Sequence, residues 1–266
     1  MSSLAHTDPA LATSGPATTG GIIESHAGMA STLPLQTATV ATHTTSAPAD
    51  VQPDDSLFEH YAWLYAFFRD RVFRDDTDRI INALWPDGLP PDGTRMIELG
   101  CGPGFYSCGF AARFHELSVL GVDQSARQLD CAKTKARQLG LLNCRFESDN
   151  VLDLTHADET FDVAIAARLF TVLPNPKRAL AEMHRVLRPG GRCVIAEPRY
   201  AFWASLPLLA MWVIAGLTRM NNGYREPRKA TVLSSQEFKG LFAAQPWRRV
   251  RTWQDGRYQY ALCEKD

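Results

Sequence analysis

The sequence predicts an α/β protein built on a doubly wound, mostly parallel sheet that closes with an antiparallel hairpin. Two observations lead to this fold class. Between residues 95 and 196, short apolar runs alternate with segments of helical periodicity, which is typical of parallel strands joined by crossover helices. At the end of the chain, two β-rich runs, 247–254 and 257–265, are joined by Asp255-Gly256, a two-residue hairpin signal.

The elements follow in order along the chain. Apolar residues at helical spacing over 57–85 predict a first helix, with a break near Asp75 and a stop at Pro86. A late helix over 234–242 precedes the hairpin, whose two strands bring the sheet to seven. The parallel part has strands at 95–99, 117–122, 143–147, 161–166 and 191–196 and helices at 105–114, 125–139 and 176–187.

The chain divides into a tail and one domain. Residues 1–53 are rich in Ala, Thr, Ser, Pro and Gly and show no hydrophobic periodicity. Such a segment buries too little apolar surface to offset the entropy of ordering it, so we expect a disordered low-complexity tail. The first basic residue is Arg69, so neither a signal peptide nor an Arg-rich transit peptide is expected. The predicted folded domain is 54–266.

Composition and net charge limit the classes of function that this protein can have. The net charge of −1 over 266 residues creates no field that would favour nucleic acid, so no nucleic-acid partner is expected. The six cysteines lack Cys-x-x-Cys spacing and lie in apolar contexts, which indicates reduced thiols in a cytoplasmic protein. None of the seven histidines pairs with a cysteine or another histidine at ligand spacing, so no metal is predicted.

The stretch 96–104, Met-Ile-Glu-Leu-Gly-Cys-Gly-Pro-Gly, predicts a cradle for a nucleotide cofactor. Glycine permits positive φ and lets a ligand approach the backbone, and a strand that leads into a helix here presents free N–H groups. The spacing is neither the Gly-x-Gly-x-x-Gly of dinucleotide-binding proteins nor a Walker loop. The carboxylate of Glu98 beside the loop favours a cationic, zwitterionic ligand over a polyphosphate.

The pattern Glu-x-Gly-x-Gly-x-Gly over 98–104 resembles the first motif of the class I S-adenosylmethionine-dependent methyltransferases. The string Arg-Val-Leu-Arg-Pro-Gly-Gly at 185–191 is similar to the turn before their fifth strand. The resemblance covers about 54–200 and the closing hairpin, and it is strongest to the small-molecule branch, which methylates quinones, lipids and secondary metabolites. It implies a Rossmann-like fold, S-adenosyl-L-methionine as cofactor, S-adenosyl-L-homocysteine as product and no metal.

The resemblance also implies which residues hold the cofactor. Asp123, at the second strand end, would accept hydrogen bonds from the ribose hydroxyls; its alternative role is a helix N-cap. Asp149, with Asp153 as its competitor, would hold the adenine amino group. Tyr65 or Tyr61 would contact the methionine end, unless it is a core residue. The full predicted set is Tyr65, Glu98, Gly100, Cys101, Gly102, Gly104, Asp123, Gln124, Asp149, Asn150, Val151 and Ala166.

The catalytic group is harder to predict. Methyl transfer is an in-line displacement that needs a nucleophile about 3 Å from the methyl group and a general base only where the acceptor must lose a proton. A histidine commonly follows the fourth strand in the small-molecule branch, but here Thr171 and Val172 stand there. The weak candidates for a base are Glu197, Tyr200 and Tyr224, each of which also has a structural interpretation.

Residues 199–230 form the least standard segment, which we expect to be a hydrophobic lid over the acceptor pocket. It contains nineteen uncharged residues, 200–218, close to the length of a membrane span. A span in mid-domain would split the sheet, and Pro207 interrupts the run. Basic residues follow the run and suit either lipid headgroups or an anionic substrate group; a cap helix with a solvated basic rim is the alternative. The predicted substrate contacts are Arg168, Phe170, Tyr200, Trp203, Trp212 and Arg225.

These observations predict an S-adenosylmethionine-dependent methyltransferase that acts on a hydrophobic small molecule. The alternative is a non-catalytic S-adenosylmethionine-binding protein docked on a membrane or a partner through the lid. The sequence predicts a cytoplasmic protein, leaves a peripheral membrane contact through 200–229 open, and does not specify the acceptor atom or the oligomeric state.

Overall fold

The computed structural model describes residues 61, 63–64, 67, 75–217 and 231–266, with the side chain of Trp203 excepted. The predicted tail 1–53 and most of the predicted first helix before Asp75 lie outside the described residues, as do Tyr65, Tyr224 and Arg225.

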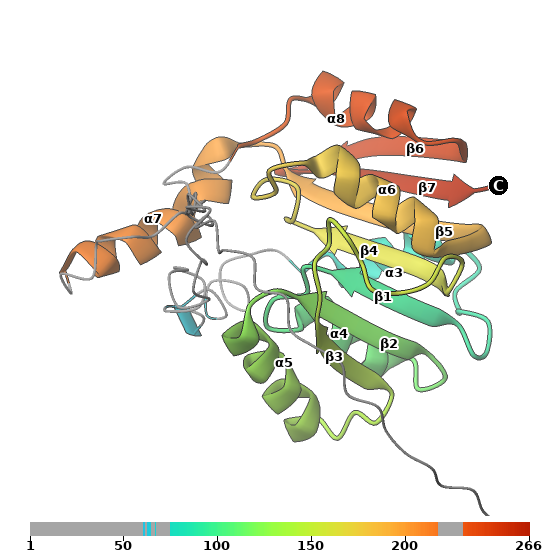
Figure 1. Ribbon diagram of the computed structural model, residues 1–266, viewed down its shortest axis with the longest axis horizontal. Helices are drawn as coiled ribbons and strands as arrows, with labels where there is room; N and C mark the ends of the chain where they lie inside the picture. Colours follow the sequence, from blue (N-terminus) through green and yellow to red (C-terminus); the bar gives the residue numbers. More distant parts are fainter. Residues whose placement is uncertain (1–60, 62, 65–66, 68–74, 218–230) are drawn as a thin grey trace, which may run out of the picture. The chain divides into compact units, whose positions relative to one another are not determined.

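A seven-stranded sheet forms the centre of the domain, with strand order β3-β2-β1-β4-β5-β7-β6 (Figure 1). The first five strands run parallel, and β7 pairs antiparallel with both β5 and β6, which confirms the predicted fold class. The order reverses between β1 and β4, so their carboxyl ends mark the topological switch point. The strands are β1 Arg95–Leu99, β2 Ser118–Asp123, β3 Cys144–Ser148, β4 Phe161–Ala167, β5 Leu187–Pro198, β6 Trp247–Asp255 and β7 Tyr258–Lys265.

Helices cover both faces of the sheet, and each face has its own apolar core. One core joins α3, α4 and α5 to the sheet through residues such as Ile80, Phe110 and Leu129. The other joins α6 and α8 to the opposite face through residues such as Met183 and Phe238. The helices are α3 Thr77–Leu84, α4 Phe105–Arg113, α5 Ala126–Gln138, α6 Pro176–Val186, α7 Ala201–Leu217, α8 Ser235–Leu241 and the 3₁₀ turn η2 Phe242–Ala244.

Two predicted turns differ from the structure. Strand β5 begins at Leu187, so the predicted Pro-Gly-Gly turn lies inside an irregular strand start, where the register with β4 shifts. The hairpin turn is Gly256-Arg257 rather than Asp255-Gly256, because Asp255 still pairs with Tyr258. Gly256 has φ 56°, and a glycine of positive φ at the first central position suits a type II′ turn.

Pro207 does not interrupt the apolar segment, since α7 continues through it. A proline inside a helix costs about 3 kcal/mol, and tertiary packing offsets this. Leu208, Met211 and Ala215 form one buried face of α7, packed against Tyr61 and Leu64. No helix among the described residues is long and apolar enough to cross a membrane.

Candidate active site

The glycine loop after β1 requires its glycines. Gly100, Gly102 and Gly104 have φ of 65°, 51° and 74°, the left-handed region that side chains disfavour. The loop is held by its backbone, since Cys101 N–H donates to the Val122 carbonyl at 3.0 Å and Gly104 N–H donates to the Cys101 carbonyl at 3.0 Å. Gly104 is also the N-cap of α4. The loop therefore places a backbone without side chains at the switch point.

Glu98 is buried at the base of this loop. Its Oε2 accepts hydrogen bonds from the backbone N–H of Ser107 at 2.8 Å and from the Ser107 hydroxyl at 2.5 Å. Ser107 lies in the first turn of α4, where the helix dipole stabilises a negative charge. Sequence reasoning missed Ser107, although a hydroxyl in an otherwise apolar first turn was a signal. The structure thus fixes a carboxylate directly beneath the glycine loop.

Asp123 lies at the end of β2 and faces the same loop. Its Oδ2 accepts from Gly102 N–H at 2.8 Å and its Oδ1 from Ser125 N–H at 2.9 Å. The N-cap of α5 is Ser125, whose hydroxyl accepts from Gln128 N–H, so the N-cap alternative for Asp123 is wrong. Asp123 thus holds the glycine loop to the end of β2; its ribose contact stays a prediction.

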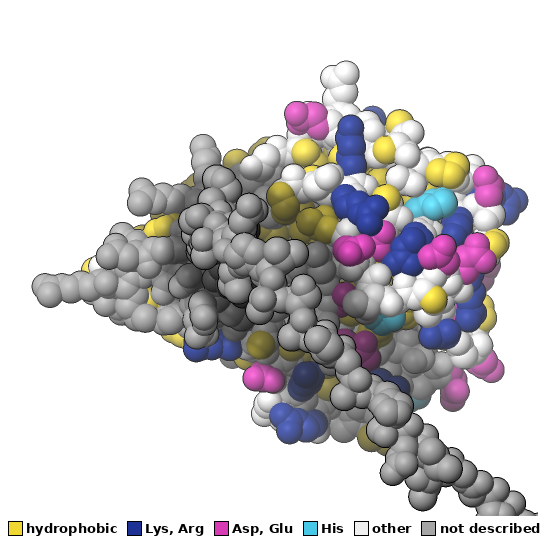
Figure 2. All heavy atoms as spheres, in the orientation of Figure 1, with side chains coloured by type: hydrophobic (Ala, Val, Ile, Leu, Met, Phe, Trp, Pro, Cys, Tyr) yellow, Lys and Arg dark blue, Asp and Glu magenta, His cyan; other side chains and the backbone are white. Residues whose placement is uncertain are grey.

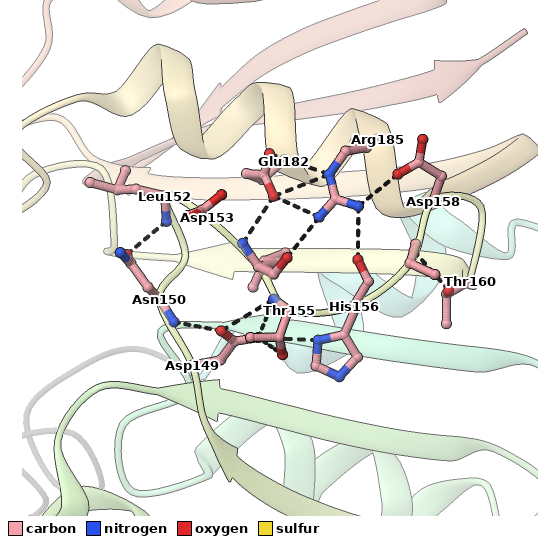
Figure 3. A network of polar contacts seen from close by, with 12 residues as sticks. Asp149, Asn150, Leu152, Asp153, Thr155, His156, Asp158, Thr160, Glu182 and Arg185 are labelled. Carbon is pink, nitrogen blue, oxygen red and sulfur yellow. Dashed lines mark hydrogen bonds and ion pairs between the residues drawn. The ribbon is translucent and has the colours of Figure 1, made fainter. Parts of the chain in front are cut away.

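Asp149 follows β3 and organises its own loop (Figure 3). Its carboxylate accepts from Asn150 N–H at 2.7 Å and from the Thr155 backbone N–H and hydroxyl at 3.1 Å each. His156 Nδ1 lies 3.1 Å from Asp149 Oδ2. The competitor, Asp153, is exposed and contacts Arg178. The inward-facing acid is therefore Asp149, and its contact with an adenine amino group stays a prediction.

An ion pair on α6 clamps the far end of this loop (Figure 3). The Arg185 guanidinium donates to Glu182, to the carbonyls of Leu154 and His156 at 2.9 and 2.8 Å, and to Asp158 Oδ1 at 2.7 Å. Burial alone would raise the pKa of Glu182, but hydrogen bonds from Arg185 and from Leu154 N–H outweigh it and lower that pKa. Arg185, the first residue of the string 185–191, thus has a structural role: it holds the loop after β3 against α6.

We expect Arg185→Ala to lower the free energy of unfolding by about 2 kcal/mol, the scale of lost hydrogen bonds to charged groups. The buried Glu182 would keep its bond from Leu154 N–H and its ion pair with Arg178 at 3.4 Å, but would lose the bonds from Arg185. Because folding lowers the pKa of Glu182 below 4.5, its stabilising contribution is complete above pH 4.5 and is lost as the pH falls below that value. The deficit of the variant should therefore shrink in acid, as urea unfolding at several pH values would show.

The matched control is Arg188→Ala. Arg188 pairs with Asp162 at 3.0 Å, and both side chains are substantially exposed, so this pair contributes about 0–1 kcal/mol. Equal losses in the two variants would contradict the role of Arg185 as a clamp.

Arg168 follows β4 and has φ 58°, a strained conformation for a residue other than glycine. Its N–H donates to the Ala196 carbonyl at 2.8 Å. Its Nε donates to the Tyr258 hydroxyl at 3.0 Å, and its guanidinium carbon lies 5.2 Å from the centroid of that ring. Tyr258 comes from the closing hairpin and could not be paired with Arg168 from the sequence. Phe170, a predicted substrate contact, is instead 2 % exposed within the apolar core.

Glu197 lies at the carboxyl end of β5 and is 1 % exposed. Its Oε1 accepts from Phe170 N–H at 2.9 Å, and burial raises its pKa to about 8. Tyr200 is exposed, and the Arg199 guanidinium lies over its ring at 5.6 Å. Of the three residues predicted as bases, Glu197 is thus the one that the described structure places against the loop after β4.

The remaining predicted residues occupy varied positions. Trp212 is partly buried against the cluster that joins α7 to Tyr61, and Trp203 has no described side chain. Tyr61 itself is a buried member of that cluster. In the cofactor set, Gln124 is exposed, whereas Cys101, Val151 and Ala166 are buried.

The charges on one face are of both signs. Figure 2 shows Lys and Arg side chains intermixed with Asp and Glu over the part of the surface that carries α6. Arg185 with Asp158 and Arg188 with Asp162 are examples of such pairs. This face therefore has no extended field of a single sign.

Comparison with known proteins agrees with this geometry. A family model described as a methyltransferase domain matches residues 90–246, and the chain belongs to this family. The fold and the residues of the first motif are those of the class I S-adenosylmethionine-dependent methyltransferases.

Named relatives include 2-methyl-6-phytyl-1,4-hydroquinone methyltransferase 2, chloroplastic, of Oryza sativa subsp. japonica, 30 % identical over 173 residues, which cover 64 % of this chain and 49 % of the rice protein. Phosphatidylethanolamine N-methyltransferase of Cereibacter sphaeroides is 36 % identical over 40 % of this chain and 51 % of its own length. The chain thus spans about half the length of these relatives.

Solved structures show the same fold. A putative S-adenosyl-L-methionine-dependent methyltransferase of Methanococcus maripaludis superposes with a TM-score of 0.56 at 14 % identity, over 82 % of this chain and 97 % of that one. Geranyl diphosphate C-methyltransferase of Streptomyces coelicolor A3(2) gives a TM-score of 0.52 at 17 % identity, over 72 % and 75 %.

Proposed function

We propose that this protein transfers a methyl group from S-adenosyl-L-methionine to a hydrophobic small molecule. The observation that carries the proposal is the glycine loop with two carboxylates around it. Glu98 is fixed beneath the loop by Ser107, and Asp123 is hydrogen-bonded to Gly102 within it. The residues fit this cofactor, because its amino acid end is zwitterionic and its ribose carries two hydroxyls for a carboxylate to bind.

When bound, the cofactor supplies an electrophilic methyl group on a sulfonium. The chain's own residues bind and orient it. The loop backbone and Asp123 would hold the nucleoside, Glu98 would favour the cationic end, and the loop 149–151 would border the adenine. Helix α7, which directly follows β5, would exclude water from the acceptor side.

A hydrophobic acceptor is supported by two observations. Helix α7 has no charged residue between Ala201 and Leu217. The related proteins of rice and C. sphaeroides are named for a phytyl hydroquinone and a phosphatidylethanolamine, both of which carry long apolar chains.

Ligand-induced thermal shift tests the cofactor directly. S-adenosylmethionine and S-adenosylhomocysteine should each raise the melting temperature, since a ligand at 100 times its Kd stabilises by about 2.7 kcal/mol. ATP, which has the same adenosine but a polyphosphate, should not. Failure of both sulfur ligands would refute the proposal. Incubation with hydroquinones and phospholipids, followed by mass spectrometry for a mass gain of one methylene, then tests transfer; binding without any transfer would favour the non-catalytic alternative.

We also propose that the protein is cytoplasmic and touches a membrane surface through α7. All six cysteines are free thiols. Phe202, Leu209, Val213 and Leu217 form an exposed apolar stripe on the side of α7 away from its buried face, and exposed apolar patches are typical of surfaces that contact a partner or a membrane. Flotation with anionic vesicles should capture the protein, and Leu209→Glu with Val213→Glu should abolish capture. Leu142→Glu, at an exposed leucine outside the stripe, is the control. Capture that survives the double variant would contradict the contact.

A further inference from the structure

Two buried oxygen atoms without hydrogen-bond partners lie on neighbouring strands at the carboxyl end of β5. One is Glu197 Oε2 and the other is Gln259 Oε1. Both residues are almost completely buried, at 1 % and 2 % exposure. A buried polar atom that makes no hydrogen bond costs about 1–3 kcal/mol, so two such atoms in one place require a physical explanation.

The sheet register places these two side chains opposite each other. Glu197 pairs with Gln259 in the antiparallel β5–β7 ladder, and directly opposed residues have Cβ atoms about 5 Å apart. Alternation along each strand puts both on the face that carries Ile195 and Ala261, which belong to the core under α6 and α8. Both side chains are long enough to meet across this distance.

The orientation of the Gln259 amide follows from its other hydrogen bond. Its Nε2 donates to the Leu233 carbonyl at 2.9 Å. A flipped amide would put two oxygens against each other at that position, so the NH₂ group is the one that faces Leu233. The Gln259 atom that is left without a hydrogen-bond partner is therefore the acceptor Oε1.

Glu197 is held in the same way on its other oxygen. Oε1 accepts from Phe170 N–H, and the N–H groups of Leu169 and Thr171 also interact with the carboxyl group. Oε2 is buried and makes no hydrogen bond. A single proton on Oε2 would convert two unsatisfied acceptors into one hydrogen bond.

We propose that Glu197 is protonated in the folded protein and that its Oε2–H donates to Gln259 Oε1, which makes Glu197 a positioning residue for the acceptor side of the site. The raised pKa of Glu197, about 8, is consistent with this state. Burial outweighs two effects that favour the carboxylate, which are the hydrogen bonds from the N–H groups of Phe170, Thr171 and Leu169 and the positive charge of Arg168.

The proposed bridge joins two segments that frame the carboxyl edge of β4 and β5. On one side, Glu197 holds the loop after β4, which begins with the strained Arg168. On the other side, Gln259 holds the segment that leads into α8 through Leu233. Thr231 N–H also donates to the Thr171 carbonyl at 3.3 Å. The role in positioning an acceptor rests on the proposed function, whereas the bridge itself does not.

The pH dependence of stability tests the bridge without any activity. The pKa of Glu197 rises from 4.5 in the unfolded chain to about 8 in the folded one, so folding takes up a proton between these pH values. Protonated Glu197 therefore adds to the free energy of unfolding in full below pH 4.5, and this contribution is lost as the pH rises toward 8. The unfolding constant should therefore rise by up to about tenfold per pH unit over this window.

Glu197→Gln is the matched variant, because its amide can accept from Phe170 N–H and donate to Gln259 Oε1 at every pH. We expect this variant to lose the tenfold dependence and to lack one infrared carboxylic-acid band that the wild type shows at pH 6. If the slopes are identical and the band is absent from the wild type, Glu197 is ionised and the proposal is overturned. Should Glu197→Gln fail to fold, Gln259→Met removes the acceptor and should shift the same band.

Activity provides a separate readout. In a working methyltransferase, kcat should fall above pH 8 in the wild type but not in Glu197→Gln, while the KM for S-adenosylmethionine stays the same. A fall in both proteins would overturn the positioning role. If no acceptor is methylated, the proposed function fails, but the stability and infrared results still decide whether the bridge exists.

Discussion

Replacing Asp123 with Ala should weaken the binding of S-adenosylhomocysteine by about 10- to 100-fold, the effect of losing hydrogen bonds to a charged group worth about 1.5–3 kcal/mol. The substitution removes the acceptor proposed for the ribose. It also releases Gly102 N–H and Ser125 N–H, which the carboxylate now holds at 2.8 and 2.9 Å. Isothermal titration calorimetry with S-adenosylhomocysteine measures this change in affinity, and the experiment does not require that the methyl acceptor be known.

Two controls separate ligand contact from loop support. Asp123→Asn keeps the shape and one acceptor oxygen, so it should give an intermediate affinity. Asp153→Ala removes an exposed acid on the neighbouring loop and should leave the affinity unchanged. An unaltered affinity in Asp123→Ala would refute the ribose assignment, and an equal loss in Asp153→Ala would show that general charge, rather than this contact, matters.

Gly104→Ala should lower the free energy of unfolding by about 3 kcal/mol, the sum of a left-handed backbone penalty of 1–2 kcal/mol and the cost of overpacking. The new Cβ would lie 2.9 Å from Ala132 Cβ and 2.9 Å from Phe146 Cζ. The Ala132 Cβ is fixed to the backbone of α5 and cannot move aside. Urea unfolding would measure the loss.

Gly140→Ala is the matched control for this prediction. Gly140 has φ of 66°, close to the 74° of Gly104, and a Cβ there would meet nothing within 4 Å. The Gly140→Ala substitution should therefore lower the free energy of unfolding only by the left-handed backbone penalty, about 1–2 kcal/mol. Equal losses at the two positions would mean that the contact of Gly104 with α5 and β3 does not limit the substitution.

The sequence predicted features that depend on neighbouring residues and missed those that depend on distant ones. The glycine loop was predictable because a strand, three glycines and a helix stand next to each other. The partners of the polar side chains divide in the same way. Ser107 is nine residues from Glu98 and carried a local signal, whereas the pairings of Glu197 with Gln259 and of Arg168 with Tyr258 depend on strand register.

The departures of the structure from the sequence predictions have identifiable physical causes. Pro207 stays within α7 because the helix buries an apolar face against Tyr61 and Leu64, and tertiary packing can override propensity. The hairpin turn moved by one residue because Gly256, and not Asp255, takes the positive φ that the first turn position requires. Phe170, predicted as a substrate contact from its place after β4, packs in the apolar core together with Leu169, and its contact with a substrate stays a prediction.

The hydrogen bonds of Asp149 within its own loop bear on the kinetics of binding. Its carboxylate is engaged by Asn150, Thr155 and His156 in the protein alone, so the loop proposed to border the adenine is held in place before any ligand arrives. Binding then costs little conformational entropy, and association approaches rigid docking. Differences in affinity between the substrate and product forms of the cofactor should therefore appear in their dissociation rates, with nearly equal association rates.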